Sequence, residues 1–433
     1  MHIGTKQEGG GKLKASTKGN PILNFFRKLG PGLVTGAADD DPAGIATYSM
    51  AGAQHGTALL WTTVLTWPLM GAVQMMCARV GMVTGEGLAG ALRKKLPRSC
   101  IVLISLALFI ANTINVGADL AGMADAAEML TGIGAHWLVP LFGLFITLAA
   151  VRCRYEQIAS ILKWLALVLF AYVITGFIIK PDWSLVARST FIPKLPANHE
   201  MWATLVAILG TTISPYLFFW QSSQEVEEEK AKGKKTVVQR RGASSQQILD
   251  RKLDVGAGTF ISNAVMFFII LTTALTLNKT GLTHIETSRQ AAEALRPLAG
   301  RFAAILFTTG IIGVGFLAIP TLAGSAAYAF AETFGWRQGL DEKFSHARSF
   351  YGVLIASVAI GVILDVLKVS AMKALYWSAV LNGLLAPFLL LGILLVSRDR
   401  KIMQEQPSSK LSLVVVSLTT LLMFLAGVGM FLF

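Results

Sequence analysis

The 433-residue chain is too apolar and too sparsely charged for a soluble protein, since 54% of its residues are hydrophobic and 15% are charged. A soluble domain carries about 25% charged residues, so we expect lipid to cover most of the surface. The net charge of +13 lies in short connecting segments rather than in one basic stripe, which argues against nucleic-acid binding. Cys77, Cys100 and Cys153 form no C-x-x-C pair, which argues against a disulfide framework or a zinc site.

Eleven segments are apolar for long enough to cross a bilayer, which takes roughly 20 residues of helix. In chain order they are about 32–54, 58–82, 100–122, 135–151, 157–179, 200–223, 254–277, 301–330, 350–367, 372–396 and 410–432. The sequence therefore predicts an all-α polytopic membrane protein. Residues 1–30 are polar and basic, unlike a cleaved signal peptide, and are expected to form a cytoplasmic N-terminal segment.

Lysine and arginine concentrate in alternate connections between these spans, which indicates which side faces the cytoplasm. The pattern places the N-terminus inside and, with an odd number of spans, the C-terminus outside an inner (plasma) membrane. The longest polar connection, 225–252, falls on the inner side. It is predicted to be a solvated, partly helical loop.

The first span contains three adjacent carboxylates, Asp39, Asp40 and Asp41, followed by Pro42 and Gly44. Each charge at the centre of a bilayer costs at least about 2.5 kcal/mol, so such a cluster indicates a functional site. Proline removes a backbone donor and glycine tolerates unusual dihedral angles, so the helix is predicted to unwind near 41–44.

The sixth span has a similar interruption, where Pro215 lies in mid-helix among Thr211, Ser214 and Tyr216. Spans one and six are the first helices of two five-helix halves, residues 31–180 and 199–397, and 410–433 forms an eleventh helix outside them. Interrupted helices at matching positions are typical of inverted-repeat transporters of the LeuT type. The expected substrate site lies where the two breaks meet.

Short motifs in the first third of the chain match one known family. They are Gly30-Pro31-Gly32, Asp41-Pro42-Ala43-Gly44, Ala51-Gly52-Ala53-Gln54-His55-Gly56, Leu59-Leu60-Trp61, Ala78-Arg79-Val80-Gly81 with Val83-Thr84-Gly85, and Ala118-Asp119-Leu120-Ala121. In these motifs the chain resembles the Nramp family of divalent metal transporters. The resemblance is strongest here and thins after the sixth span.

The resemblance implies that Asp41 is the metal-binding aspartate, with Gly44 in the position of the family's asparagine ligand. In the sixth span Thr211 stands for the family's alanine, Ser214 for its methionine ligand and Tyr216 for its histidine. These departures look like the Nramp-related branch associated with magnesium transport.

In the third span, Gly122 replaces the family's glutamate linked to proton movement. The resemblance therefore does not imply proton coupling for this chain.

The predicted metal site, Asp41, Gly44, Thr211, Ser214 and Tyr216, contains oxygen donors and no sulfur. Such donors suit Mg²⁺ and Mn²⁺, and Mg²⁺ tends to keep several of its waters. Mutual repulsion should prevent the three carboxylates from binding one ion together. With Asp41 as the ligand that the resemblance implies, Asp39 or Asp40 is predicted to lie at a vestibule.

Other polar residues recur inside apolar spans and are candidates for the pathway around the ion. Asn112, Asn115 and Asp119 repeat at roughly helical spacing and are predicted to line one face. Asn263 and Asn382 either face the cavity or hydrogen-bond between helices. Asp119 either carries protons or hydrogen-bonds within the bundle.

The predicted function is alternating-access transport of Mg²⁺, with Mn²⁺ accepted and without strong proton coupling, by a monomer that needs no cofactor. Three alternatives stay open: a proton-coupled Mn²⁺/Fe²⁺ symporter of ordinary Nramp type, a LeuT-fold symporter of a small organic cation, and a cation channel. The sequence contains no H-E-x-x-H, Walker A or G-x-S-x-G motif, so we expect no enzymatic activity.

Overall fold

The computed structural model describes residues 35, 36, 38–152, 167–365 and 369–433, and all the regular structure in these ranges is helical. The spanning helices and their pieces are α3 (Pro42–His55), α4 (Trp61–Thr84), α6 (Arg98–Thr131), α7 (Ala135–Arg152), α9 (Phe170–Ile178), α11 (His199–Thr212), α12 (Pro215–Ala231), α14 (Ser245–Thr276), α17 (Ala303–Phe334), α18 (Arg348–Leu364), α19 (Ala371–Arg398) and α20 (Lys410–Leu432). The short connecting helices are η1 (Gly56–Leu59), α5 (Leu88–Leu92), η2 (Leu167–Leu169), α10 (Trp183–Phe191), α13 (Val237–Arg240), η3 (Asn278–Thr280), α15 (Ser288–Ala292), η4 (Glu293–Leu295), α16 (Arg296–Ala299) and η5 (Gly300–Phe302).

Within these ranges, seven helical stretches are long and apolar enough to cross a membrane, or up to eight if the bent pair Pro42–Leu59 and Trp61–Thr84 is one span. Each of the eleven predicted ranges overlaps a helix. Residues 32–34 and 37 of the first range, 157–166 of the fifth and 366–367 of the ninth lie outside the described residues. The bend of 109° between the members of the pair agrees with two separate spans. The division into two five-helix halves stays a prediction.

The first break lies slightly earlier than predicted. Residues 35, 36, 38 and 39 are helical, the chain bends at Asp40, and α3 starts at Pro42. Asp41 is the N-cap of α3, and its Oδ1 accepts a hydrogen bond of 2.7 Å from the backbone N–H of Gly44. Proline is suited to the first turn of a helix and aspartate to its cap, so Pro42 begins the second piece instead of prolonging the unwound segment.

The second break lies where it was predicted, because α11 ends at Thr212 and α12 begins at Pro215. The Ser214 hydroxyl lies 2.6 Å from the carbonyl oxygen of Gly210 and 2.7 Å from that of Thr211. It therefore satisfies carbonyls that the proline leaves without an amide partner.

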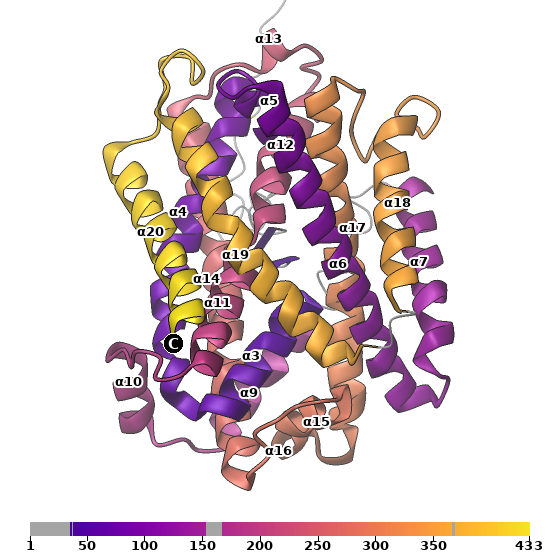
Figure 1. Cartoon of the computed structure of the whole chain (residues 1–433), viewed down its shortest axis with the longest axis vertical. Helices are drawn as coiled ribbons and strands as arrows, with labels where there is room; N and C mark the ends of the chain where they lie inside the picture. Colours follow the sequence, from indigo (N-terminus) through magenta and orange to yellow (C-terminus); the bar gives the residue numbers. More distant parts are fainter. Residues whose placement is uncertain (1–34, 37, 153–166, 366–368) are drawn as a thin grey trace, which may run out of the picture.

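Helices α3 and α11 lie inside the bundle, with α14 and α19 beside them (Figure 1). Very close backbone approaches fix these contacts: a Cβ at Gly52 of α3 would lie 2.4 Å from the carbonyl oxygen of Ile270 in α14. A Cβ at Gly210 of α11 would lie 2.0 Å from the carbonyl oxygen of Ala379 in α19. Small residues permit such tight packing between membrane helices.

The connecting helices gather at the two ends of the bundle in the way the charge pattern predicts (Figure 1). Helices α10, α15 and α16, from connections predicted to be outside, lie at one end, and the C-terminus is at that end too. Helices α5 and α13, from connections predicted to be inside, lie at the opposite end. Connections predicted to lie on one side of the membrane therefore share one end of the bundle, whichever end faces the cytoplasm.

The connection 225–252 is partly helical and mostly accessible to solvent, as predicted, but residues near its two ends are buried. It contains the end of α12, all of α13 and the start of α14, and Glu225 and Arg251 are only 2% and 8% exposed. The Arg251 guanidinium contacts the carboxylates of Glu225 at 2.7 Å and Asp254 at 2.6 Å, and also pairs with Glu228. Burial is tolerated here because each charge has an opposite partner, so this network ties α12 to α14.

The close contact at Gly210 predicts a specific sensitivity to one added methyl group. Gly210→Ala should lower the thermal midpoint of the protein in detergent, because overpacking typically costs about 1–3 kcal/mol. Gly256→Ala is the matched control, since a Cβ at this helical glycine of α14 meets nothing within 4 Å. Equal midpoints for the two variants would contradict the α11–α19 packing described here.

Candidate metal-binding site at the two helix breaks

Asp41 lies at the centre of the candidate site, and it is only 2% exposed. Its Oδ1 is held by the backbone of α3, while its Oδ2 lies 3.4 Å from both the Asn115 amide nitrogen and the Tyr216 hydroxyl. These two contacts are long, so Oδ2 is only weakly engaged. No described lysine, arginine or histidine forms an ion pair with Asp41.

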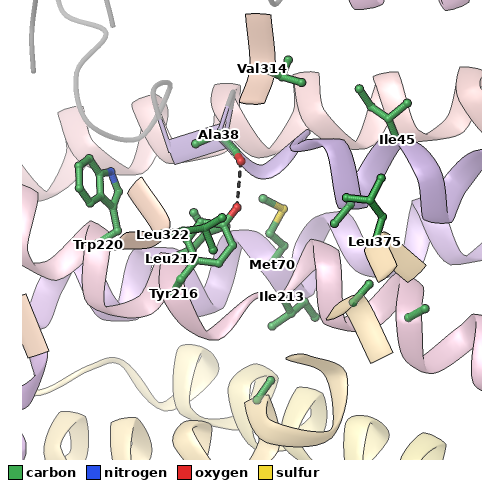
Figure 2. Packing of buried hydrophobic residues seen from close by; sticks show 14 of the residues in the cluster. Ala38, Ile45, Met70, Ile213, Tyr216, Leu217, Trp220, Val314, Leu322 and Leu375 are labelled. Atoms are coloured by element: carbon green, nitrogen blue, oxygen red, sulfur yellow. Dashed lines mark hydrogen bonds between the residues drawn. The ribbon is translucent and has the colours of Figure 1, made fainter. Parts of the chain in front are cut away.

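Tyr216 links the two breaks directly. Its hydroxyl, on the first turn of α12, donates a 2.9 Å hydrogen bond to the carbonyl oxygen of Ala38, just before the first break (Figure 2). Leu217 and Trp220 of the same helix lie alongside in the buried cluster. Since Tyr216 has one hydroxyl hydrogen and Ala38 is the nearer acceptor, its oxygen lone pairs remain able to face a cation.

Gly44 and Thr211 face each other across the site. A Cβ at Gly44 would lie 3.1 Å from Thr211 Oγ1 and 3.3 Å from Asp41 Oδ1. Any side chain at position 44 would thus point between the carboxylate and the hydroxyl. Thr211 Oγ1 is buried and has no hydrogen-bond partner among the described residues. The structure therefore brings Asp41, Gly44, Thr211 and Tyr216 together, with Ser214 in the adjoining break.

Asp39 or Asp40 was predicted to lie at a vestibule, but both carboxylates are buried. They are 0% and 3% exposed, and both accept from the Ser262 hydroxyl of α14, at 2.8 Å and 3.1 Å. The physical reason is the packing of the first span against α14, where Gly36 meets the backbone of Gly258. Ser262 was not predicted from the sequence, because a serine in an apolar helix has no distinctive pattern.

Asn115 and Asp119 of α6 flank Asp41, as their spacing predicted. The Asn115 carbonyl oxygen accepts a 2.7 Å bond from Ser378 of α19, so its amide is oriented toward Asp41. Asp119 is fully buried and close enough for its charge to act on Asp41. Neither of its carboxylate oxygens reaches hydrogen-bond geometry with a described group. Ser378 is a second residue that the sequence analysis missed.

Asn112, also predicted to line this face of α6, instead donates to Leu322 and Ser325 of α17, both at 2.8 Å. It therefore joins the two helices.

Asn263 takes the interhelical alternative. It accepts a 2.7 Å bond from Thr66 of α4 and donates to the Thr259 carbonyl oxygen at 2.9 Å. Asn382 is 2% exposed, with its carbonyl oxygen unpartnered among the described groups, and it adjoins Gly383, which packs on α11. Asn263 thus joins α14 to α4, whereas the Asn382 carbonyl oxygen remains able to accept a hydrogen bond near the second break.

The described residues contain no group of three or more His, Cys, Asp and Glu side chains placed to hold a metal. A site built from one or two carboxylates, hydroxyls and amide oxygens would not form such a group. This donor set favours a hard cation that retains water over a softer, fully protein-ligated metal.

Comparison with known proteins identifies the family of the chain. The family model described as "Natural resistance-associated macrophage protein-like" (Nramp) matches residues 32–432. The chain belongs to the Nramp family. The resemblance to this family inferred from the sequence is therefore confirmed.

Two relatives show how far the sequence likeness extends. The divalent metal cation transporter MntH of Caldanaerobacter subterraneus is 27% identical, over 96% of this chain and 95% of that protein. MntH of Yersinia enterocolitica is 26% identical, over 68% of this chain and 71% of that protein. These Nramp relatives are named as transporters rather than enzymes.

Solved structures share the fold. The Eremococcus coleocola manganese transporter superposes with a TM-score of 0.72 at 18% identity, covering 95% of this chain and 87% of that one. Mhp1 in its inward-facing conformation gives a TM-score of 0.52 at 12% identity, covering 93% and 88%. The predicted fold, an all-α polytopic membrane protein of LeuT type, is confirmed.

The site geometry predicts different roles for the three adjacent carboxylates. Asp41→Asn should remove measurable divalent-cation binding, because the amide still caps α3 but carries no charge. Asp39→Asn and Asp40→Asn should weaken binding less, since these carboxylates lie with Ser262. Calorimetric titration of the purified Nramp-family protein with Mg²⁺ and Mn²⁺ measures all three. A larger loss in Asp40→Asn would move the ligand by one residue.

Proposed function

We propose that this Nramp-family protein transports largely hydrated Mg²⁺, and accepts Mn²⁺, by alternating access across an inner membrane. It acts as a monomer with the N-terminus in the cytoplasm and the C-terminus outside. The metal is the transported substrate and not a resident cofactor. The observation that carries the proposal is the donor set around Asp41, which consists of oxygen atoms and includes no thioether.

The first support is electrostatic. Asp39, Asp40 and Asp41 are at most 3% exposed, and no ion pair joins them to a described basic side chain. Buried carboxylates without a partner are costly, so a visiting cation offers the compensation that the protein does not provide itself. A divalent ion compensates more of the carboxylate charge than a monovalent ion does.

The second support is the size and hydrogen-bonding state of the ligands. Gly44 offers no side-chain ligand, and a Cβ there would already lie 3.1 Å from Thr211 Oγ1, so the donors at the breaks are limited to the short side chains around it. The Ser214 hydrogen is directed to backbone carbonyls, which leaves its lone pairs for a cation or its waters. Mg²⁺ gives up water reluctantly and is commonly held with several waters in place.

The relatives support a divalent cargo in general terms. Those of Caldanaerobacter and Yersinia are named divalent metal cation transporters, and the Eremococcus protein is named a manganese transporter. The preference for Mg²⁺ rests on the side chains of this chain alone.

Weak proton coupling is proposed from the surroundings of Gly122. A Cβ at this position would lie 2.9 Å from Leu375 Cδ1, so an apolar side chain fills the space where a glutamate would begin. Asp119 remains as a single buried carboxylate on the same helix. This arrangement distinguishes the proposal from a proton-coupled Mn²⁺/Fe²⁺ symporter.

Uptake by the purified protein in liposomes tests the proposal and its rivals together. We expect uptake of Mg²⁺ and Mn²⁺, with internal pH unchanged relative to protein-free liposomes. Internal acidification that follows the ion would instead support the proton-coupled symporter. Uptake of Fe²⁺ or Cd²⁺ without Mg²⁺ or Mn²⁺ would refute the hard-ion assignment, and uptake of small amines alone would support the organic-cation alternative.

Selectivity should change when sulfur is introduced at the second break. Ser214→Met should raise Cd²⁺ transport relative to Mg²⁺, because a thioether suits softer metals and a longer side chain displaces water. Ser214→Ala is the control, since it removes the hydroxyl without adding sulfur. An identical ratio of Cd²⁺ to Mg²⁺ uptake in the two variants would show that position 214 does not contact the ion.

A further inference from the structure

Tyr48 has a fully buried hydroxyl group that no described residue satisfies. It lies on α3, is 0% exposed, and its oxygen has no hydrogen-bond partner in the described chain. Buried tyrosine hydroxyls normally find a partner, because leaving one unsatisfied is costly. Neither the sequence motifs nor the site described above assigns a role to this group.

The helical geometry directs Tyr48 toward the metal site. Gly44 and Tyr48 are four positions apart and share one face of α3, and Asp41, the N-cap, accepts a hydrogen bond from the Gly44 N–H. Side chains on a helix lean toward its N-terminus, which directs the Tyr48 ring back toward the first break. Gly44 lies between Tyr48 and Asp41 on this face and has no side chain to separate them.

A second buried hydroxyl without a hydrogen bond, that of Thr211, lies beside the same site. Thr211 Oγ1 lies beside the Cβ position of Gly44 and toward Tyr48, yet neither hydroxyl forms a hydrogen bond by strict geometry. The charges of Asp39, Asp40 and Asp41 all act on the Tyr48 hydroxyl. Two unsatisfied hydroxyls from different helices therefore lie beside the carboxylate that we assign to the ion.

A merely structural role accounts less well for this arrangement. Tyr172 of α9 is also buried, at 2% exposed, and its hydroxyl also lies toward another hydroxyl, that of Ser49, without forming a hydrogen bond, but none of the three carboxylates acts on it. Tyr172 thus shows what a core tyrosine looks like in this bundle. Tyr48 differs from it by facing the ion site.

The chemistry of a hydrated cation suits these hydroxyls. Water bound to a cation turns its hydrogens outward, so the surrounding wall must offer acceptors. Each hydroxyl oxygen has two lone pairs, and one of the two hydroxyls can donate to the other without losing that capacity. Backbone N–H groups at the start of α3 cannot serve in this way.

We propose that Tyr48, together with Thr211, accepts hydrogen bonds from the water molecules that stay on the transported ion, and so favours an ion that keeps its waters. The assignment rests on the proposed transport of hydrated Mg²⁺. Tyr48 is then a specificity-determining residue that contacts the hydration shell and not the metal itself.

The test compares Tyr48→Phe with Tyr172→Phe, which removes an equally buried and equally unpartnered hydroxyl elsewhere. The Mg²⁺ KM for liposome uptake should rise about threefold to tenfold in Tyr48→Phe, the range expected for one or more lost hydrogen bonds. The Mn²⁺ KM should rise less, and Tyr172→Phe should leave both unchanged. Inhibition of Mg²⁺ uptake by cobalt(III) hexaammine, whose ligands do not exchange, should also weaken in Tyr48→Phe.

The outcomes separate this inference from the proposed function. Absence of Mg²⁺ uptake by the unmodified protein would refute the proposed function itself. Mg²⁺ uptake with the same KM in both tyrosine variants, an equal rise for Mg²⁺ and Mn²⁺, or unchanged hexaammine inhibition would refute the role of Tyr48. If Tyr48→Phe does not fold, Thr211→Val removes the facing hydroxyl and should give the same ion-dependent shift.

Discussion

The burial of three adjacent carboxylates without a described basic partner is the constraint on which the rest of the structure depends. Asp39, Asp40 and Asp41 lie in a span that crosses an apolar medium, where an uncompensated charge is expensive. The chain reduces this cost with hydrogen bonds from Ser262, from Asn115 and from the first turn of α3. These bonds are too few to replace an opposite charge, so the site remains suited to a cation.

The two helix breaks make that site possible, since an unbroken helix would use its backbone groups internally. Each break has a proline at the first position of the following helix, and each has a short polar side chain before it. Asp41 caps one helix start, and Ser214 satisfies the carbonyls at the other break. Tyr216 then joins the breaks through Ala38, so the site is held by contacts between distant parts of the chain.

Close packing around the breaks fixes the position of these groups. Helices α3 and α11 approach α14 and α19 so closely that a single methyl group at Gly52 or Gly210 would collide with backbone. The ion pair between Arg251 and Glu225 ties α14 to α12. Rigid contacts next to unwound segments are typical of transporters in which one group of helices moves against another around a fixed site.

The sequence by itself determined the helical class, the apolar ranges, the two interrupted spans and the Nramp-family resemblance, because these depend on local composition and spacing. It placed the first break near 41–44 and treated 225–252 as solvated, since it does not show that Pro42 starts a helix or that Arg251 has buried acidic partners. Only the tertiary structure decided that Ser262 donates to Asp39 and Asp40, that Ser378 orients Asn115, and that Thr211 lies beside Gly44 and Asp41. Those contacts join residues far apart in the chain, and their geometry arises from helix packing rather than from any local pattern.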